Sequence, residues 1–310
     1  MSTTAAAPRI LVVGSANLDI VVPVGHHPVR GETVLGGDHV LVAGGKGANQ
    51  AVSASRLGGS VQFIGRVGAD TAGEILRTSL DGAGVITNLL AVDSDVPSGI
   101  ALITVDPEGD NAIAVSPGAN ATLTPSRVND DPAVRGAISR ADVVLLQLET
   151  PVETVTEIAR LATGVVILDP APAPDSPLPA QLLEHVDIVV PNETELAVLA
   201  GVGPSPSVDD IASAARTIGV DIVVVTLGSR GAVVVTADDT FEVPAPSVQP
   251  IDTTGAGDAF RASLAVSLSS GATLEEAAEL AVRVGAATTL VAGAQPSMPT
   301  RAEVDQRLDR

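Results

Sequence analysis

Residues 141–170 read ADVVLLQLETPVETVTEIARLATGVVILDP, a stretch in which two apolar runs flank a segment long enough for a helix. The runs, at residues 141–149 and 164–170, consist mainly of Val, Ile and Leu with little polar alternation. Such strands are typical of parallel sheets whose two faces are both covered, because neither face meets water. Residues 186–192 and 221–228 repeat the pattern. The sequence therefore predicts an α/β protein with a parallel sheet between two layers of helices.

Two β-rich segments interrupt this alternation of strands and helices. Residues 18–43 and 97–117 alternate short apolar runs with turn residues, and DPEGDN at residues 106–111 has the composition of a hairpin turn. We expect these segments to form a small second sheet set against the main one. The whole chain, residues 1–310, is predicted to be one domain, since its length is near the upper limit for a single hydrophobic core.

Composition narrows the possible functions. Apolar residues make up 45% of the chain but aromatic residues only 1%, so Val, Ala, Leu and Ile must fill the core. A formal net charge of −20 repels nucleic acid and anionic membrane surfaces, and the absence of cysteine removes thiol nucleophiles and thiolate metal sites. The first ten residues lack the pattern of a signal peptide, and no apolar run approaches ~20 residues. We therefore expect a cytoplasmic protein that binds neither nucleic acid nor membranes.

The glycine-rich segment GGKGAN, residues 44–49, does not match the common phosphate-loop motif. That motif needs a glycine five residues before Gly-Lys and a Ser or Thr after it, whereas this chain has Val40 and Gly47 at those places. The first strand runs into ILVVGSANLD, residues 10–19, with one glycine where a dinucleotide fingerprint needs three. A nicotinamide-dependent enzyme is therefore disfavoured.

TTGAGD, residues 253–258, combines a turn of small residues with an acid at the start of a predicted helix. Backbone N–H groups at a helix N-terminus attract anions, and Gly255, Ala256 and Gly257 leave room for a close approach. Asp258 could then take a proton from an attacking hydroxyl while the N–H groups hold the charge on a phosphoryl group. The alternative is that Asp258 is simply a favourable charge near a helix N-terminus.

The sequence resembles the ribokinase-like, or PfkB, family of carbohydrate kinases. DTTGAGDAF at residues 252–260 is similar to the C-terminal signature of that family, and GGKGANQA at residues 44–51 to its N-terminal signature. Further similar pieces follow in order: GSANLD (14–19), PGAN (117–120), LLQLE (145–149), PNETE (191–195), TLGSRG (226–231) and GAQPSMP (293–299). The resemblance implies a three-layer α/β/α domain with a small β-sheet lid. It also implies ATP-dependent phosphorylation of D-ribose at O5.

The resemblance assigns roles to individual residues. Asp258 is implied to be the catalytic base, with Gly255, Ala256 and Gly257 as the anion hole. The implied sugar ligands are Asn17, Asp19, Gly45, Lys46, Asn49 and Glu149, together with Asp258. The implied ATP site is formed by Asn192, Glu195, Thr226, Gly228, Ser229 and Gly231, with Asn192 and Glu195 placing Mg²⁺, largely through water.

The resemblance also implies a monovalent cation, K⁺, beside the anion hole. Its implied ligands are Asp252 and Ser297 through side chains, and Thr254, Thr288, Val291 and Gly293 through carbonyl groups. In this family the lid pairs with a second copy, so a homodimer is expected. The other expected partners are the small-molecule sugar and ATP.

Three residues depart from the family pattern. Arg261 stands where the family usually has Asn or another small or neutral residue, and Ala262-Ser263 replaces Gly-Ala. One helical turn after Asp258, the guanidinium of Arg261 is predicted to contact that carboxylate, the alternative being that it extends to solvent. Two other functions therefore stay open. One is a weakly active sensor that binds sugar or nucleotide, and the other is a kinase for deoxyribose, fructose or a nucleoside.

Overall fold

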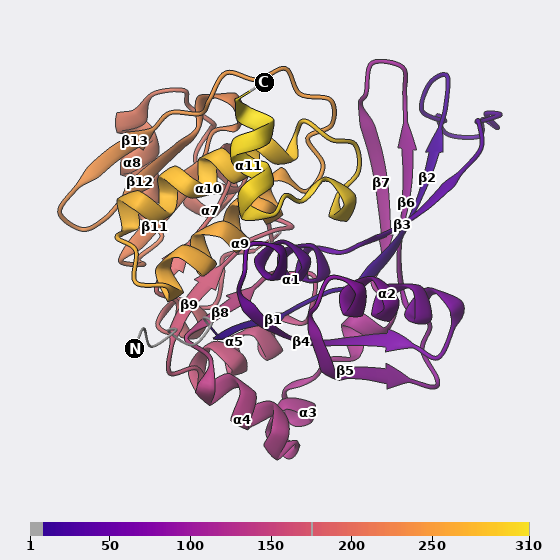
Figure 1. The fold of residues 1–310 in the computed structure, drawn as a ribbon, viewed down its shortest axis with the longest axis horizontal. Coiled ribbons are helices and arrows are strands. Elements are labelled where there is room, and N and C mark those ends of the chain that lie inside the picture. The colour runs from indigo at the N-terminus through magenta and orange to yellow at the C-terminus, as the bar shows by residue number, and fades with distance from the viewer. Residues whose placement is uncertain (1–8, 175, 310) are drawn as a thin grey trace.

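The main body of the protein is a nine-stranded sheet between two layers of helices (Figure 1). The computed structural model describes residues 9–174 and 176–309. Across the sheet the strands lie in the order β13 (Thr240–Val243), β12 (Ala232–Val235), β11 (Ile222–Thr226), β10 (Ile188–Val189), β9 (Val165–Leu168), β8 (Val143–Leu146), β1 (Arg9–Val13), β4 (Ser60–Gly68) and β5 (Ile86–Asp93). All neighbours are parallel except β11–β12 and β12–β13. The predicted α/β fold with a parallel sheet is confirmed, with an antiparallel extension at one edge.

The central strands of the main sheet supply side chains to two separate cores. On β1, Ile10 and Val12 belong to one cluster of buried residues, whereas Leu11 and Val13 belong to the other, because successive side chains point to opposite faces. The first core is covered by α1 (Lys46–Arg56), α2 (Thr71–Gly82), α9 (Ala256–Ser269), α10 (Leu274–Thr288) and α11 (Arg301–Leu308). The second is covered by α3 (Pro125–Asp130), α4 (Pro132–Arg140), α5 (Val152–Leu161), α6 (Ala180–Leu183), α7 (Glu193–Ala200) and α8 (Val208–Arg216).

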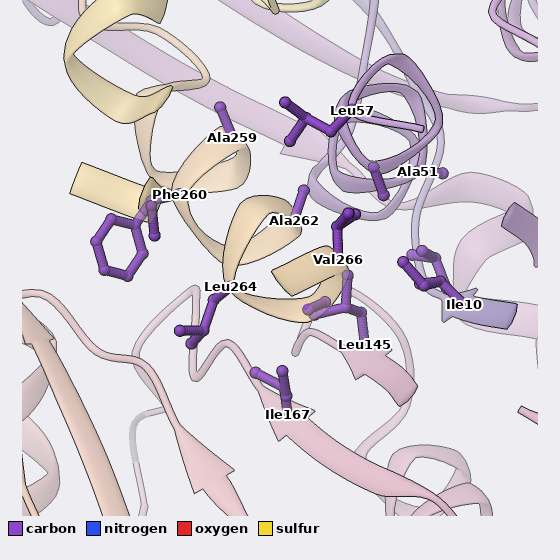
Figure 2. Packing of buried hydrophobic residues seen from close by; sticks show 14 of the residues in the cluster. Ile10, Ala51, Leu57, Leu145, Ile167, Ala259, Phe260, Ala262, Leu264 and Val266 are labelled. Carbon is purple, nitrogen blue, oxygen red and sulfur yellow. The ribbon is translucent and has the colours of Figure 1, made fainter. Parts of the chain in front are cut away.

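Helix α9 lies in the middle of the first core. Figure 2 shows Ala262 and Val266 on the side of α9 that faces α1, with Leu264 pointing toward β8 and β9. The small side chains let α9 pack closely on α1 and α10, since alanine adds little volume at a helix contact. This aliphatic packing fixes the start of α9, which carries Asp258.

The small second sheet stands apart from the main body (Figure 1). Its order is β3 (Val40–Gly44), β2 (Asn17–Pro23), β6 (Gly99–Val105) and β7 (Asn111–Ser116). The β2–β6 pair is parallel and the other two pairs are antiparallel. The predicted hairpin turn at residues 106–111 joins β6 to β7, where Asp106 accepts hydrogen bonds from the amides of Glu108 and Asp110. No helix within residues 9–174 and 176–309 is both long and apolar enough to cross a membrane.

Candidate active site

A cavity of about 660 Å³ opens where β10 and β11 end and α9 begins. Ligand sites of α/β proteins commonly lie at this carboxyl end of the strands. The structure brings many of the predicted site residues to its wall: Lys46, Asn192, Glu195, Thr226, Gly228, Ser229, Gly231, Gly255, Ala256, Gly257 and Asp258. They come from segments up to 212 positions apart in the sequence (46 to 258), so their meeting depends on the tertiary fold.

The residues predicted to form the anion hole lie at the N-terminus of α9. Gly255 is the N-cap with φ of 77°, a left-handed conformation that favours glycine. The first N–H groups of a helix have no partner within it, and Gly255, Ala256 and Gly257 line the cavity at the start of α9, where Ala256 N donates to the carbonyl of Thr253. The geometry suits a phosphoryl group with negative charge.

Asp258 lies in the first turn of α9 with 7% of its surface exposed. Its Oδ2 accepts a hydrogen bond from Asn49 Nδ2 at 2.9 Å, and its Oδ1 accepts one from Gln50 Nε2 at 3.2 Å. Two side-chain amides of α1 therefore fix the orientation of the carboxylate. Such fixed orientation is what a base needs if it is to meet a substrate hydroxyl.

Three buried polar residues around Asp258 were missed by the sequence analysis. Gln50 Nε2 also donates to Asp169 Oδ2 at 2.9 Å, and Gln147 Nε2 donates to Gln50 Oε1 at 2.6 Å. Gln50 and Gln147 lie inside the quoted segments GGKGANQA and LLQLE, and Asp169 directly follows β9. For Gln147 and Asp169 the available signal was a polar side chain at the end of a buried strand, whereas Gln50 lies within helix α1.

The predicted sugar ligands lie where the small sheet joins the main body. Asn17 and Asp19 are on β2, and Gly45 precedes α1 as its N-cap. Glu149 Oε2 accepts hydrogen bonds from Lys46 N at 3.1 Å and from the hydroxyl of Ser15. Hydroxyl-rich ligands need both donors and acceptors, and these amide and carboxylate groups provide them.

Two charged groups of this region have shifted pKa values. Burial, with added repulsion from Glu149 and Asp258, raises the pKa of the Asp19 carboxyl to about 7. For Lys46, burial alone would lower the pKa, but the carboxylates of Asp169, Asp258 and Glu149 outweigh it and keep the pKa above its ordinary value. Lys46, a predicted sugar ligand, thus stays a cation at the cavity wall.

Asn17 is held by a second amide that the sequence analysis did not assign to the site. Asn120, which is 1% exposed, donates from Nδ2 to Asn17 Oδ1 at 2.8 Å and accepts from Ala16 N at 3.0 Å. The space around this pair depends on Gly99, where a Cβ atom would lie 2.2 Å from Asn17 Oδ1 and 2.3 Å from Asn120 Nδ2. PGAN and Gly99 therefore build a socket for the Asn17 side chain.

Gly99→Ala should raise KM for the sugar about tenfold, the effect of one misplaced hydrogen bond. The added methyl would push the Asn17 and Asn120 amides apart, since both lie closer than contact distance. Steady-state kinetics measure the change, and Gly82→Ala is the control, because a Cβ atom at Gly82 meets open space. An unchanged KM in Gly99→Ala would mean that the socket does not position Asn17.

Asn192 and Glu195 form a capping box at the start of α7. Asn192 Oδ1 accepts from Glu195 N, and Glu195 Oε2 accepts from Asn192 N, both at 2.8 Å. Both residues line the cavity, so a carboxylate at its edge is available to a hydrated cation. Among the described residues no three His, Cys, Asp or Glu side chains gather into a metal cluster, so a divalent ion would need water and nucleotide oxygens as its other ligands.

The residues predicted for the monovalent cation lie on two adjoining loops. Asp252 Oδ1 accepts from Thr254 N at 2.9 Å, and its Oδ2 accepts from Gly293 N at 2.7 Å. Burial opposes the charge, but these hydrogen bonds hold the pKa of Asp252 below its ordinary value. The remaining predicted ligands, Thr288, Val291 and Ser297, lie at the end of α10 and in the loop after it. A carboxylate and hydroxyl oxygens on these loops fit a cation with oxygen ligands.

The prediction for Arg261 is wrong in both of its alternatives. The side chain is 4% exposed, and its guanidinium turns away from Asp258 to pair with Asp169 Oδ1 at 3.0 Å and Glu195 Oε2 at 3.5 Å. Helix spacing favoured an i,i+3 contact, but the long arginine stem reaches the ends of β9 and β10 instead. Ala262 and Ser263 are fully buried in α9, outside the described lining of the cavity.

Comparison with known proteins shows similarity to one family over nearly the whole chain. The model of the pfkB family carbohydrate kinases matches residues 7–301. A ribokinase of Bacillus subtilis is 38% identical over 97% of this chain and 99% of its own length. The structure of Arabidopsis thaliana ribokinase complexed with ribose and ATP aligns with a TM-score of 0.90 and 35% identity, covering 98% of this chain and 99% of that one.

A second solved structure, the ribokinase of Thermotoga maritima, has a TM-score of 0.88 and 35% identity, and the alignment covers 98% of this chain and all of that one. The family and the fold expected from the sequence motifs are therefore confirmed. The family model spans nearly the whole chain, and the relatives match it from end to end, so both comparisons assign the chain to the same family. The chain belongs to the pfkB family of carbohydrate kinases.

Proposed function

We propose that the protein transfers the terminal phosphoryl group of ATP to O5 of D-ribose, giving ribose 5-phosphate. The observation that carries the proposal is the position of Asp258, which lies between the amides of α1 and the N-terminus of α9 in the cavity wall. The ribokinases matched over the whole chain support the substrate, and one of them has been solved with ribose and ATP.

In this reaction Asp258 accepts the proton of the 5-hydroxyl as that oxygen attacks the γ-phosphorus of ATP, and the bond from this phosphorus to the bridging oxygen breaks, so that ADP leaves. The N–H groups at the start of α9 hold the charge that develops on the transferring group, and the helix dipole adds to their effect. Lys46, kept protonated by its acidic neighbours, adds positive charge at the same wall. Asn17, Asp19, Gly45, Asn49 and Glu149 bind the other hydroxyls and so fix which oxygen attacks.

ATP is proposed to lie on the side of the cavity opposite the sugar. Thr226, Gly228, Ser229 and Gly231 would border the nucleotide, and Asn192 and Glu195 would hold Mg²⁺ through water. When bound, this ion would neutralise phosphate charge. Since ATP is the phosphoryl donor, we place the reaction in the cytoplasm.

The small sheet is proposed to act as a lid over the sugar. Its strand β2 carries Asn17 and Asp19, so closing the sheet would bring sugar ligands and cover together. Exclusion of water matters because water is a competing phosphoryl acceptor. Apolar side chains remain exposed on the sheet, among them Leu102, Ile113 and Val115, and a second copy of the chain that pairs through this sheet would cover them in a homodimer.

Activity should rise several-fold when K⁺ replaces Na⁺ or a bulky organic cation at equal ionic strength. A cation held by Asp252, Ser297 and the loop carbonyls would stabilise the loop before Gly255 and add positive potential there. Initial rates in the three salts measure the effect. Equal rates in all three would count against a cation site in this enzyme.

A panel of sugars and nucleosides, tested with ATP and Mg²⁺ and followed by ADP release, tests the proposed function. We expect D-ribose to have the highest kcat/KM of the panel, with the product phosphorylated on O5. Deoxyribose, fructose or a nucleoside turned over tenfold more efficiently would replace ribose as the substrate. Binding of sugar without turnover of any panel member would indicate a sensor.

A further inference from the structure

Arg261 is a charged side chain buried inside the catalytic cavity wall. Its Nε and Nη2 donate to the carbonyl of Val190 at 3.0 and 2.7 Å, and Nη2 lies 3.0 Å from Asp169 Oδ1 and 3.5 Å from Glu195 Oε2. One side chain of α9 thus connects the residues that follow β9 and β10 with the first turn of α7. These contacts tie the element with the anion hole to the element with the Asn192–Glu195 pair.

Asp169 continues the connection toward the base. While its Oδ1 faces Arg261, its Oδ2 accepts from Gln50 Nε2 at 2.9 Å, and the same nitrogen donates to Asp258 Oδ1 at 3.2 Å. Asp169 is 1% exposed, and Arg261 is the only cation for which an ion pair with it is found among the described residues. The chain of contacts therefore runs from Glu195 through Arg261, Asp169 and Gln50 to Asp258.

We infer that Arg261 and Asp169 are a positioning pair for phosphoryl transfer: they hold the carboxylate of Asp258 and the first turn of α7 in fixed relative places. This inference rests on the proposed function for its kinetic consequences only. Asp169 lies outside the lining of the cavity, and Arg261 borders the cavity with its guanidinium bound to Val190 and the two carboxylates. A fork-shaped guanidinium suits the role, because it can donate twice to one carbonyl while facing two carboxylates.

Loss of Arg261 leaves Asp169 as a buried charge with no ion pair among the described residues, and loss of Asp169 leaves Arg261 with only the more distant Glu195 carboxylate, whereas loss of both leaves neither charge. Arg261→Asn and Asp169→Asn should each lower kcat about tenfold or more, since a shift of the reacting groups by a fraction of an ångström is costly. KM for the sugar should change less than about threefold, because neither substitution removes a predicted sugar ligand.

The double variant should have a higher Tm and a higher kcat than Arg261→Asn alone. Arg261→Lys, which keeps the charge and loses the fork, should fall between the wild type and Arg261→Asn.

Arg77→Asn is the matched control. Arg77 also leaves a helix, α2, to donate to strand carbonyls, those of Thr87 and Leu90, but it does so at the far edge of the sheet. Its substitution should lower Tm and leave kcat and KM unchanged. If Arg261→Asn and Asp169→Asn behave like this control, or if the double variant shows the product of the single effects, the pair does not position the site.

The same experiments separate this inference from the proposed function. Kinetics use the best substrate of the sugar panel, so a wrong choice of sugar does not affect the comparison of variants. Tm is measured on the free protein without sugar, nucleotide or metal ion. A failure of all turnover would reject the proposed function, whereas additive Tm changes in the free protein would reject the pair.

Discussion

Asp258→Asn should lower kcat by roughly 10²–10⁴-fold, the usual contribution of a general base, and leave the affinity for ribose nearly unchanged. Asparagine keeps the shape of the side chain and can still accept a hydrogen bond from one of the two amides, that of Asn49 or Gln50, but it cannot take the proton of the 5-hydroxyl. Single-turnover kinetics measure the chemical step, and calorimetric titration with ribose measures the affinity.

Glu276→Gln is a suitable control for Asp258→Asn. Glu276 is an exposed acid in the first turn of α10, where it belongs to a capping box, so its neutralisation tests the effect of a charge near a helix N-terminus alone. It should change Tm slightly and kcat not at all. Turnover near the wild-type rate in Asp258→Asn would show that Asp258, too, is only a helix-terminal charge.

Asp19→Asn should raise KM for ribose about 100-fold and, at pH 8, raise the Tm of the free protein by a few degrees. The loss of affinity follows from the removal of a charged acceptor for sugar hydroxyls, a hydrogen bond worth roughly 1.5–3 kcal/mol. The gain in stability follows from the burial of Asp19, which disfavours its charged form, with added repulsion from Glu149 and Asp258. Removing one of three nearby negative charges relieves their repulsion.

The raised pKa of Asp19 determines how the difference in Tm between Asp19→Asn and the wild type changes with pH. The pKa of Asp19 in the folded protein is about 7, above the ordinary value of 3.8 that applies to the unfolded chain. Between these values the folded protein holds a proton that the unfolded chain releases, so the wild type loses stability as the pH rises through this range. Asp19→Asn lacks that loss, and its advantage in Tm should therefore disappear below pH 4.

Thermal unfolding from acid to pH 8 measures the difference between Asp19→Asn and the wild type. Asp110→Asn is the control, because Asp110 is an exposed acid of the same small sheet's hairpin turn. A constant difference in Tm at all pH values would contradict the raised pKa of Asp19. An unchanged KM would remove Asp19 from the sugar site.

The fold could be predicted from the sequence because the strands carry the signal locally. Uninterrupted runs such as residues 143–146 and 222–225 are apolar on both faces, which only a sheet covered on both sides requires. The antiparallel pairing of β12 and β13 was not predicted, since those strands are four residues long and their order depends on contacts distant in sequence. Motif spacing placed the anion hole and Asp258 on α9 for the same local reason.

The polar network behind the site could not be predicted in this way. Arg261 and Asp169 are 92 positions apart (169 to 261), and no local pattern tells a buried arginine from an exposed one. Helical periodicity gave the direction of the Arg261 Cβ atom but not the course of the long stem beyond it. The same applies to Asn120. Its motif PGAN can be recognised in the sequence, but its contact with Asn17 exists only once β2 and β6 pair.

The aliphatic core has a practical consequence for fluorescence spectroscopy of this enzyme. With no Trp, no Tyr and three Phe residues, the protein has no indole or phenol chromophore. An indole introduced at one chosen place would therefore be the only one in the molecule. Leu102 on β6, with 56% of its surface exposed, is such a place. Emission from a Leu102→Trp variant would come from the small sheet alone, and stopped-flow traces would follow its movement without any background fluorescence to subtract.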